Sequence, residues 1–322
     1  MKVSLTTIGS ATEDTFLVSN DIMVIDNHER DITCEKLIAF EYGAKLPTEY
    51  FESHVGGTAV NVAVGLARQG IETAVCSVIG NDNAGRNVLQ VLEGEGVDTE
   101  LINVNRKNKT DRSLIIIDNK TKERTIFVHK DAGKETEQDF LRINTDCIYL
   151  SSLKYNWQKT FNIVIKLAKK KNKRIFFTPG VLQVRAGMNK LKNFMKVVEV
   201  IFLNLDEAIE FSLAKIKNKE IDFQKDSKNI EKLAKIIAST GPKVVVITAG
   251  SAGAYIYHKG LKHFKPKPVQ IQDITGAGDA FASGFLAKYL QGETIEKASR
   301  NAILNSSSVI AEVGTLVGLR QF

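Results

Sequence analysis

Short runs of apolar, mostly β-branched residues alternate with longer amphipathic stretches along most of this chain. The short runs have the length and composition of buried strands, and they cover residues 3–9, 73–80, 146–152, 174–179, 200–204 and 243–250. Apolar residues at helical spacing predict helices over 58–69, 83–95, 157–171, 207–211, 226–240, 277–290 and 295–312. Gly70 and Gly96 would end the first two of these helices. The alternation predicts an α/β fold, an open and mostly parallel sheet with helices on both faces.

Two segments depart from this rhythm, because they alternate apolar and polar residues with a period of two and contain no good helix. In the second segment, Ser113–Asp118 and Arg124–Lys130 flank the sequence NKTKE and predict a hairpin. We therefore expect an α/β domain of residues 1–14, 56–99 and 131–322, into which a β-rich lid of residues 15–55 and 100–130 is inserted. Such a lid could exclude water from a site at the sheet edge. It could also join two copies of the chain, and we expect a homodimer through it.

The composition is that of an ordinary soluble globular protein, with 322 residues of which 43% are hydrophobic and 25% charged. No segment approaches the length of a membrane span, and the amino terminus does not resemble a signal peptide. Three distant cysteines without CxxC spacing disfavour disulfides and zinc, so we expect a cytoplasmic protein. The net charge of +7 comes from lysine runs such as residues 166–174. These runs lack interleaved aromatic residues, so we expect solvated helix ends and no binding to nucleic acid or membranes.

The strongest chemical signal is the sequence DITGAGDAFASGFL at residues 273–286. Gly276 and Gly278 can take positive φ values, so successive N–H groups can converge on an anion at the positive end of the predicted helix. Asp279 follows in the first turn, either as an ordinary helix-start residue or as a base for a hydroxyl that attacks a phosphoryl group. A P-loop sequence is absent, and the dinucleotide pattern GxGxxG fails at Phe281. The segment therefore indicates a site for a phosphate or a developing oxyanion.

Two segments near the amino terminus place polar residues where open α/β sheets bind ligands. Asp14 lies just beyond the first predicted strand. The sequence HVGGTAVN then brings Gly56, Gly57 and Asn61 to the start of the first predicted helix. The glycines would let a sugar lie against the backbone, and Asn61 could bond one of its hydroxyls. The alternatives are that Asp14 is a turn residue and Asn61 a helix cap.

These strings, together with NLDE at residues 204–207 and ITAGSAGAYIY at residues 247–257, resemble the ribokinase family, also called the PfkB carbohydrate kinases. The resemblance follows the family's order and covers essentially the whole chain. It implies the ribokinase-like fold and a kinase that uses ATP and Mg²⁺. The acceptor would be a hydroxyl, most simply a primary one, of a ribose- or fructose-like sugar.

The resemblance also implies roles for individual residues. Asp279 would be the catalytic base, and the transferred phosphoryl group would be stabilised by the amides of Gly276, Ala277 and Gly278. The acceptor sugar would be held by Asp14, Gly56, Gly57 and Asn61. The nucleotide and its phosphates would contact Asn204, Thr248, Gly250, Gly253 and Asn305. Glu207 would hold Mg²⁺ through water, and a monovalent cation, usually K⁺, would lie at Asp273 and Ser308.

The sequence departs from the family at two places. Thr178 occupies a position before a proline where many sugar kinases carry Asn or Asp. The lid segment 37–54 matches no single sugar specificity. The candidate substrate neighbours in the lid are Glu41 and His54 in this segment and Arg124 in the predicted hairpin. A nucleoside kinase is the alternative activity, with a base stacked on lid aromatics among Phe40, Tyr42 and Phe51. A non-catalytic sugar-binding protein on the same scaffold is a further alternative.

Overall fold

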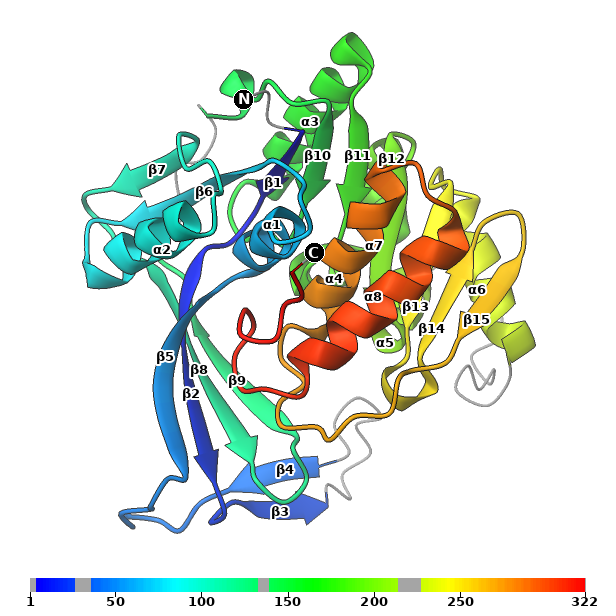
Figure 1. The fold of residues 1–322 in the computed structure, drawn as a ribbon. Helices are drawn as coiled ribbons and strands as arrows, with labels where there is room; N and C mark the ends of the chain where they lie inside the picture. The colour runs from blue at the N-terminus through cyan, green and yellow to red at the C-terminus, as the bar shows by residue number, and fades with distance from the viewer. Residues whose placement is uncertain (1–3, 27–35, 133–138, 214–226, 322) are drawn as a thin grey trace.

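A nine-stranded sheet forms the centre of the computed structural model, which describes residues 4–26, 36–132, 139–213 and 227–321 (Figure 1). Its strands run parallel from β7 to β13 and antiparallel from β13 to β15. In sheet order they are β15 (Leu261–Phe264), β14 (Ala254–Tyr257), β13 (Val244–Thr248), β12 (Val198–Asn204), β11 (Arg174–Phe177), β10 (Cys147–Leu150), β1 (Leu5–Ile8), β6 (Thr73–Gly80) and β7 (Ile102–Asn105).

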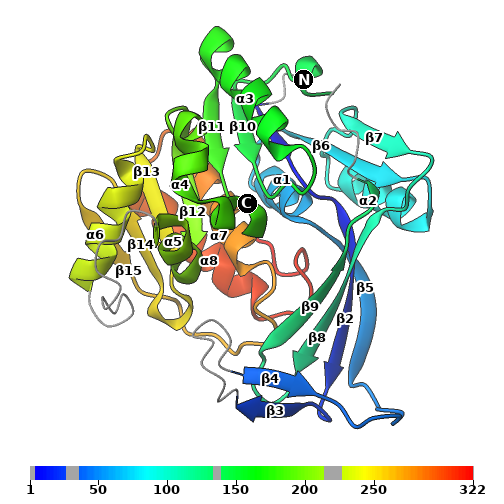
Figure 2. The same cartoon turned by 180° about the vertical axis from the view of Figure 1, so that it is seen from behind.

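Helices cover both faces of this sheet (Figures 1 and 2). One face carries α1 (Thr58–Ala67), α2 (Asn83–Gly94), α7 (Ala277–Leu290) and α8 (Ile295–Val309). The other face carries α3 (Trp157–Lys171), α4 (Val181–Met195), α5 (Leu205–Ser212) and α6 (Ser227–Ala238). Successive strand residues point to opposite faces, so Phe176 packs with Tyr289 of α7 while Phe177 packs with Phe194 of α4. Both faces are therefore hydrophobic, and the predicted α/β architecture, an open and mostly parallel sheet with helices on both faces, is confirmed.

A second sheet projects from the large one and forms the lid (Figures 1 and 2). Its strand order is β5 (Tyr50–Gly56), β2 (Thr12–Ser19), β8 (Asp111–Asp118) and β9 (Arg124–His129). The hairpin predicted around NKTKE is present, with Ile117 opposite Arg124. The short strands β3 (Met23–Asp26) and β4 (Lys36–Ala39) pair separately at the end of the lid. Residues 27–35 of the predicted lid segment lie outside the described residues.

The lid has two faces, which the strand register defines. The inner face carries Asp14, Phe16 and Ile115, and Phe16 packs with Val313 from the segment after α8. The outer face carries the alternate residues, and it includes Leu17, Phe51, Leu114 and Phe127. The inner face therefore looks toward the α/β domain. Phe51 and Phe127 stay exposed on the outer face, and Ile126 and Val128 of β9 stay exposed on the inner face.

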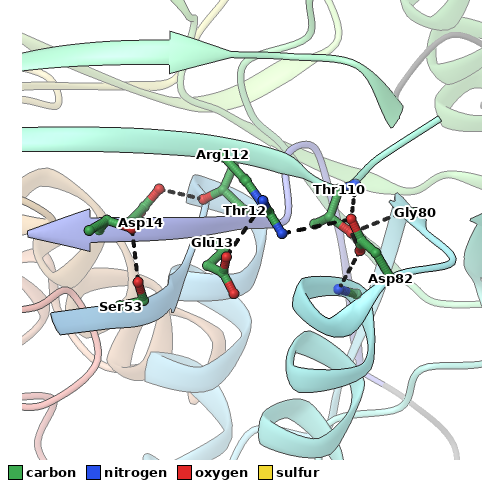
Figure 3. A network of polar contacts seen from close by, with 10 residues as sticks. Thr12, Glu13, Asp14, Ser53, Gly80, Asp82, Thr110 and Arg112 are labelled. Atoms are coloured by element: carbon green, nitrogen blue, oxygen red, sulfur yellow. Dashed lines mark hydrogen bonds and ion pairs between the residues drawn. The ribbon is translucent and has the colours of Figure 1, made fainter.

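The boundaries differ from the expected ones at two places. β7 pairs with β6, so Ile102–Asn105 belongs to the large sheet and the second lid segment begins near Thr110 rather than at residue 100. β2 begins at Thr12, so the first lid segment starts before residue 15. A network holds this junction, since Asp82 at the start of α2 accepts hydrogen bonds from Gly85 N (3.0 Å) and Thr110 Oγ1 (2.6 Å) (Figure 3).

One helix was not predicted. α4 contains Gly187 with φ 73°, which breaks the helical backbone and interrupts the apolar periodicity. Its residues Val184, Met188 and Leu191 are nevertheless buried against the sheet. None of the helices in the described ranges has the length and apolarity that a membrane crossing requires.

Candidate active site

The glycine-rich segment turns directly into α7. Gly276 has φ 78°, in the left-handed region, and a Cβ there would lie 3.0 Å from the side chain of Thr315. A Cβ at Gly278 would meet no atom within 4 Å, because the backbone there faces an open cleft. The first amides of α7 have no partner inside the helix, and the helix dipole adds positive potential at the same end. This end of α7 can therefore bind an anion, as the sequence predicts.

Asp279 lies in the first turn of α7 and meets residues from the start of α1. Its Oδ2 accepts a hydrogen bond from Asn61 Nδ2 at 2.8 Å, although the two residues are 218 positions apart. The Thr58 hydroxyl also bonds the Asp279 carboxylate. Thr315 Oγ1 donates to Asn61 Oδ1 at 2.9 Å, which turns the amide nitrogen of Asn61 toward Asp279. The two predicted halves of the site thus come together.

The carboxyl group of Asp279 is a weaker acid than an ordinary aspartate. Burial in the cleft raises its pKa to about 6, the hydrogen bonds from Asn61 and Thr58 oppose this rise, and the nearby charge of Asp14 adds to it. A carboxylate with a pKa near neutrality is a better proton acceptor than one with an ordinary pKa. The geometry and the pKa both suit Asp279 to general-base chemistry.

Asp14 and the two glycines form the acceptor side of the site. Asp14 is 7% exposed, and its Oδ1 accepts a hydrogen bond from Thr12 Oγ1 at 2.9 Å (Figure 3). A Cβ at Gly56 would lie 1.9 Å from Asp14 Oδ2, so glycine is required for the carboxylate to lie against the backbone of β5. Gly57 has φ 96° and precedes α1. Burial raises the pKa of Asp14 despite its hydrogen bonds from Thr12 and Ser113.

A cleft of about 320 Å³ extends from Asp279 along the carboxyl ends of β11, β12 and β13. The described residues around it include Thr58, Arg124, Ser152, Thr178, Asn204, Glu207, Thr248, Gly276, Ala277, Gly278 and Asp279. Asn204 and Glu207 cap α5 reciprocally, with Glu207 N donating to Asn204 Oδ1 at 2.8 Å and Asn204 N donating to Glu207 Oε2 at 3.0 Å. Burial raises the pKa of Glu207, and the charge of Asp279 adds to this rise.

Asn305 is placed differently from the prediction. It is fully buried, its Nδ2 donates to Ala280 O at 2.8 Å, and its Oδ1 accepts from Arg320 N at 3.0 Å. The amide therefore joins α8 to α7 and to the end of the chain, and Asn305 is absent from the described wall of the cleft. The same wall does not include Gly250 or Gly253, which form the turn between β13 and β14.

The predicted cation residues also have structural roles. The Oδ1 atom of Asp273 accepts hydrogen bonds from Thr275 N (2.8 Å) and Thr275 Oγ1 (2.6 Å), which shape the turn before α7. Ser308 lines a separate cavity of about 260 Å³ with Leu304 and Arg320. Within the described residues, no group of at least three His, Cys, Asp or Glu side chains is arranged to hold a metal ion.

The three candidate substrate neighbours in the lid lie at different places relative to the cleft. Arg124 lines the cleft, and its Nε is buried without a hydrogen-bond partner among the described residues. His54 lies opposite Asp14 in the β2–β5 register, and its Nε2 bonds the Tyr50 hydroxyl at 2.7 Å. Glu41 is exposed beyond β4. Sequence reasoning missed Thr58 and Thr315; Thr58 follows the paired glycines, but no sequence signal marks Thr315.

Comparison with known proteins agrees with this geometry. A family model described as "pfkB family carbohydrate kinase" matches residues 19–321. An uncharacterised sugar kinase of Archaeoglobus fulgidus is 28% identical over 80% of this chain and 98% of its own length. A nucleoside kinase of Methanothermobacter thermautotrophicus is 28% identical over 81% of this chain and 79% of its own length. The crystal structure of a ribokinase from Cryptococcus neoformans in complex with ADP superposes with a TM-score of 0.77 at 19% identity, covering 99% of this chain and 98% of that one.

The family match spans nearly the entire chain, and the site contains an acid, an anion-binding helix end and an elongated cleft in one place. These features are those of an enzyme that transfers a phosphoryl group to an alcohol. The chain belongs to the pfkB family of carbohydrate kinases.

Proposed function

We propose that this protein transfers the γ-phosphate of ATP to a hydroxyl, most simply a primary one, of a small sugar. The observation that carries the proposal is the position of Asp279, whose carboxylate has a pKa of about 6 and faces Asn61 and Thr58 at the anion-binding end of α7. The acceptor hydroxyl would lie between Asp14 and Asp279, and the triphosphate would lie along the cleft.

Each group then has a chemical task. Asp279 takes the hydroxyl proton as the oxygen attacks the γ-phosphorus, and Asn61 holds the carboxylate in place. The amides of Gly276, Ala277 and Gly278 stabilise the negative charge on the transferred group. Asp14 accepts a hydrogen bond from a second hydroxyl of the acceptor and so orients the sugar. Thr248, on the cleft wall, contacts the nucleotide, as we also propose for Gly250 and Gly253.

The residues present fit a Mg²⁺ ion that is held mainly by the nucleotide. Asn204 and Glu207 line the cleft and offer oxygen ligands, which Mg²⁺ prefers, and Mg²⁺ commonly keeps several waters beside one or two carboxylates. Glu207 would hold the ion through water, and the ion would neutralise charge on the phosphates. We also propose a K⁺ ion at Asp273 and Ser308.

A substrate panel tests the proposal. Purified protein with ATP and Mg²⁺ should release ADP in the presence of some pentoses, hexoses, sugar acids or nucleosides, and the product should carry one phosphate. Asp279→Asn should lower kcat by about 10²- to 10⁴-fold, because the proton acceptor is lost, while ATP binding measured by calorimetry is retained. Asp206→Asn, an exposed acid in α5, is the matched control and should keep full activity. Near-normal turnover by Asp279→Asn would exclude the assigned base.

Nucleoside phosphorylation is the alternative, since nucleosides carry the same kind of hydroxyl and a nucleoside kinase is among the relatives. The register does not support stacking of a base on Phe51, because Phe51 lies opposite Leu17 on the outer face of the lid. Exclusive turnover of nucleosides in the panel would replace the sugar proposal. Binding of sugars without any ADP release would instead favour a non-catalytic sugar-binding protein.

We also propose that two copies associate through the outer face of the lid. Phe51 is 62% exposed and Phe127 is 56% exposed on this face, with Leu17 and Leu114 between them. A hollow of about 430 Å³ lies beside Leu114 and Phe127. Exposed apolar clusters of this kind commonly mark contact surfaces between proteins.

A further inference from the structure

A lysine at the base of the lid has its charge directed to the acceptor side of the site. Val128 lies opposite Ser113, which lies opposite Asp14, so all three residues are on the inner face. Lys130 follows Val128 by two positions, so it continues the inner face just beyond β9. Arg124, at the other end of β9, lies on the same inner face, since it is separated from Val128 by an even number of positions. The strand therefore directs one cation toward the cleft and another toward Asp14.

Lys130 lines a small pocket that adjoins the cleft. The pocket has a volume of about 40 Å³, and its lining includes Gly9, Ser10, Asp111, Ser152 and Lys154. Ser152 also lines the large cleft, so the two spaces share a wall. Ser10 approaches the turn before α1, since a Cβ at Gly57 would lie 2.4 Å from Ser10 O. The pocket therefore borders the cleft at Ser152 and lies beside the turn that precedes α1, where Gly56 and Gly57 are.

The ammonium group of Lys130 is partly buried, and the two carboxylates near it, Asp111 and Asp14, form no ion pair with it among the described residues. Burial lowers its pKa, the charges of Asp111 and Asp14 oppose this effect, and Lys154 adds to it. Among the described residues, neither a hydrogen bond nor an ion pair to Lys130 Nζ is present. Asp111 uses its Oδ1 to accept the N–H groups of Asp131 (2.7 Å) and Ala132 (3.0 Å). A half-buried cation of this kind is stabilised when a ligand supplies the missing negative charge.

The surrounding contacts hold the lysine in position. The Tyr155 hydroxyl donates to Lys130 O at 3.1 Å, and Lys154 Nζ lies 5.0 Å from the centre of the Tyr155 ring. Asp111 fixes the two residues that follow Lys130, as described above. Tyr155 therefore ties Lys130 to the α/β domain, Asp111 of β8 ties the residues that follow it to the lid, and Lys154 brings a second positive charge to the same pocket.

We propose that this pocket receives a carboxylate on the acceptor, so that the substrate is a sugar acid and Lys130 is its specificity-determining residue. The inference rests on the proposed kinase activity and names its substrate class. A carboxylate suits the pocket better than a phosphate for two reasons. The space holds only a small group. The nearby carboxylates of Asp111 and Asp14 repel a dianion more strongly than a monoanion.

The test compares acceptors that differ only in charge. ADP release is measured with five- and six-carbon aldonic and 2-oxo sugar acids, with the corresponding neutral sugars, and with fructose and fructose 6-phosphate. The wild-type protein should show a kcat/KM for at least one acid that is about 10-fold or more above that of its neutral counterpart. Lys130→Met should raise the KM for this acid by about 10- to 100-fold, as loss of a charge-assisted hydrogen bond predicts, with an unchanged KM for ATP. Lys130→Arg should retain part of the preference.

Lys107→Met, an exposed lysine in the loop between β7 and β8, is the matched control and should behave as wild type. Thermal melting of each variant shows whether it folds, and calorimetry with the acid alone measures binding without turnover. Equal efficiency with acids and neutral sugars would overturn the carboxylate proposal, as would a preference for fructose 6-phosphate or an unaltered acid KM in Lys130→Met. Absence of ADP release with every acceptor would instead overturn the proposed kinase function.

Discussion

The pKa of Asp279 links its burial to the pH dependence of catalysis. A base must be ionised to accept a proton, and burial has moved the pKa of this carboxyl from 3.8 to about 6. We expect kcat/KM to rise about tenfold per pH unit below about pH 6 and to level off above it. Initial rates between about pH 5 and pH 8, with the acceptor below its KM, measure this profile. A flat profile over this range would show that another group takes the proton.

The raised pKa of Asp279 also predicts that its buried carboxylate lowers the free energy of unfolding at neutral pH. Above about pH 6 the Asp279 carboxylate is charged in both the folded and the unfolded state, and its burial destabilises the fold. As the pH falls from about 6 toward 3.8, the folded state takes up a proton before the unfolded state does, so this cost disappears. Asp279→Asn removes the charge, and at about pH 8 we expect it to raise the free energy of unfolding by about 1–3 kcal/mol. Urea unfolding at this pH, with Asp206→Asn as control, tests it, and a destabilised variant would contradict it.

Sequence motifs identified the residues that carry charge or glycine flexibility. The short motifs that contain these residues combine glycines with an acid or an amide at the start of a predicted helix or just after a strand. This combination singled out Asp279, Asn61, Asp14 and the neighbouring glycines. Asn305 was misplaced because an amide at a helix position can serve a ligand or an interface equally well, and only packing decides. Thr315 orients Asn61 from 254 positions away, and no local pattern records that contact.

At the scale of elements, β9 is the lid strand that contributes a side chain to the wall of the cleft. Arg124 begins this strand and lines the cleft with Thr58 and Gly276, and its Nε has no hydrogen-bond partner among the described residues. Burial lowers its pKa, and the charge of Asp273 opposes this effect. A buried guanidinium with unused donors is suited to a phosphoryl group.

We therefore expect Arg124→Met to lower kcat by about 10- to 100-fold, because a cation near the transferred group is lost. Arg124→Lys should recover part of the rate. Arg106→Met, at an exposed arginine in the loop between β7 and β8, is the control for charge alone. Steady-state kinetics with saturating ATP separate kcat from KM, and an unchanged kcat in Arg124→Met would remove Arg124 from the reaction.

The elements that were predicted well have strong and uninterrupted patterns. The buried strands and α7 are nearly continuous apolar or small-residue runs, which few other structures accommodate. β7 was assigned to the lid because INVN alternates like an exposed strand, whereas in the structure it pairs in parallel with β6. α4 was missed because Gly187 divides its apolar face. Pairing partners and kinks are decided by tertiary contacts, which local periodicity does not record.

At the scale of the whole molecule, the site is assembled from distant parts of the chain. Asp14 comes from the start of the lid, Asn61 from α1, Arg124 and Lys130 from the end of the lid, and Asp279 from α7. In the proposed function the lid carries residues for both substrates, so its position relative to the α/β domain would affect access to the site. A contact that steadies the lid would therefore support both binding and catalysis.

An association of two lids would supply such a contact, and it gives the last prediction. The outer face carries Phe51, Leu17, Leu114 and Phe127 across neighbouring strands, and burying them against a second copy would remove them from water. We expect a dimer in sedimentation equilibrium at micromolar concentration. Phe127→Lys should be largely monomeric, because a lysine would be buried in an apolar interface, and its acceptor KM should rise. Leu213→Lys, an equally exposed leucine at the end of α5, should remain dimeric. A monomeric wild-type protein would exclude the lid interface, and a dimeric Phe127→Lys would place the interface elsewhere.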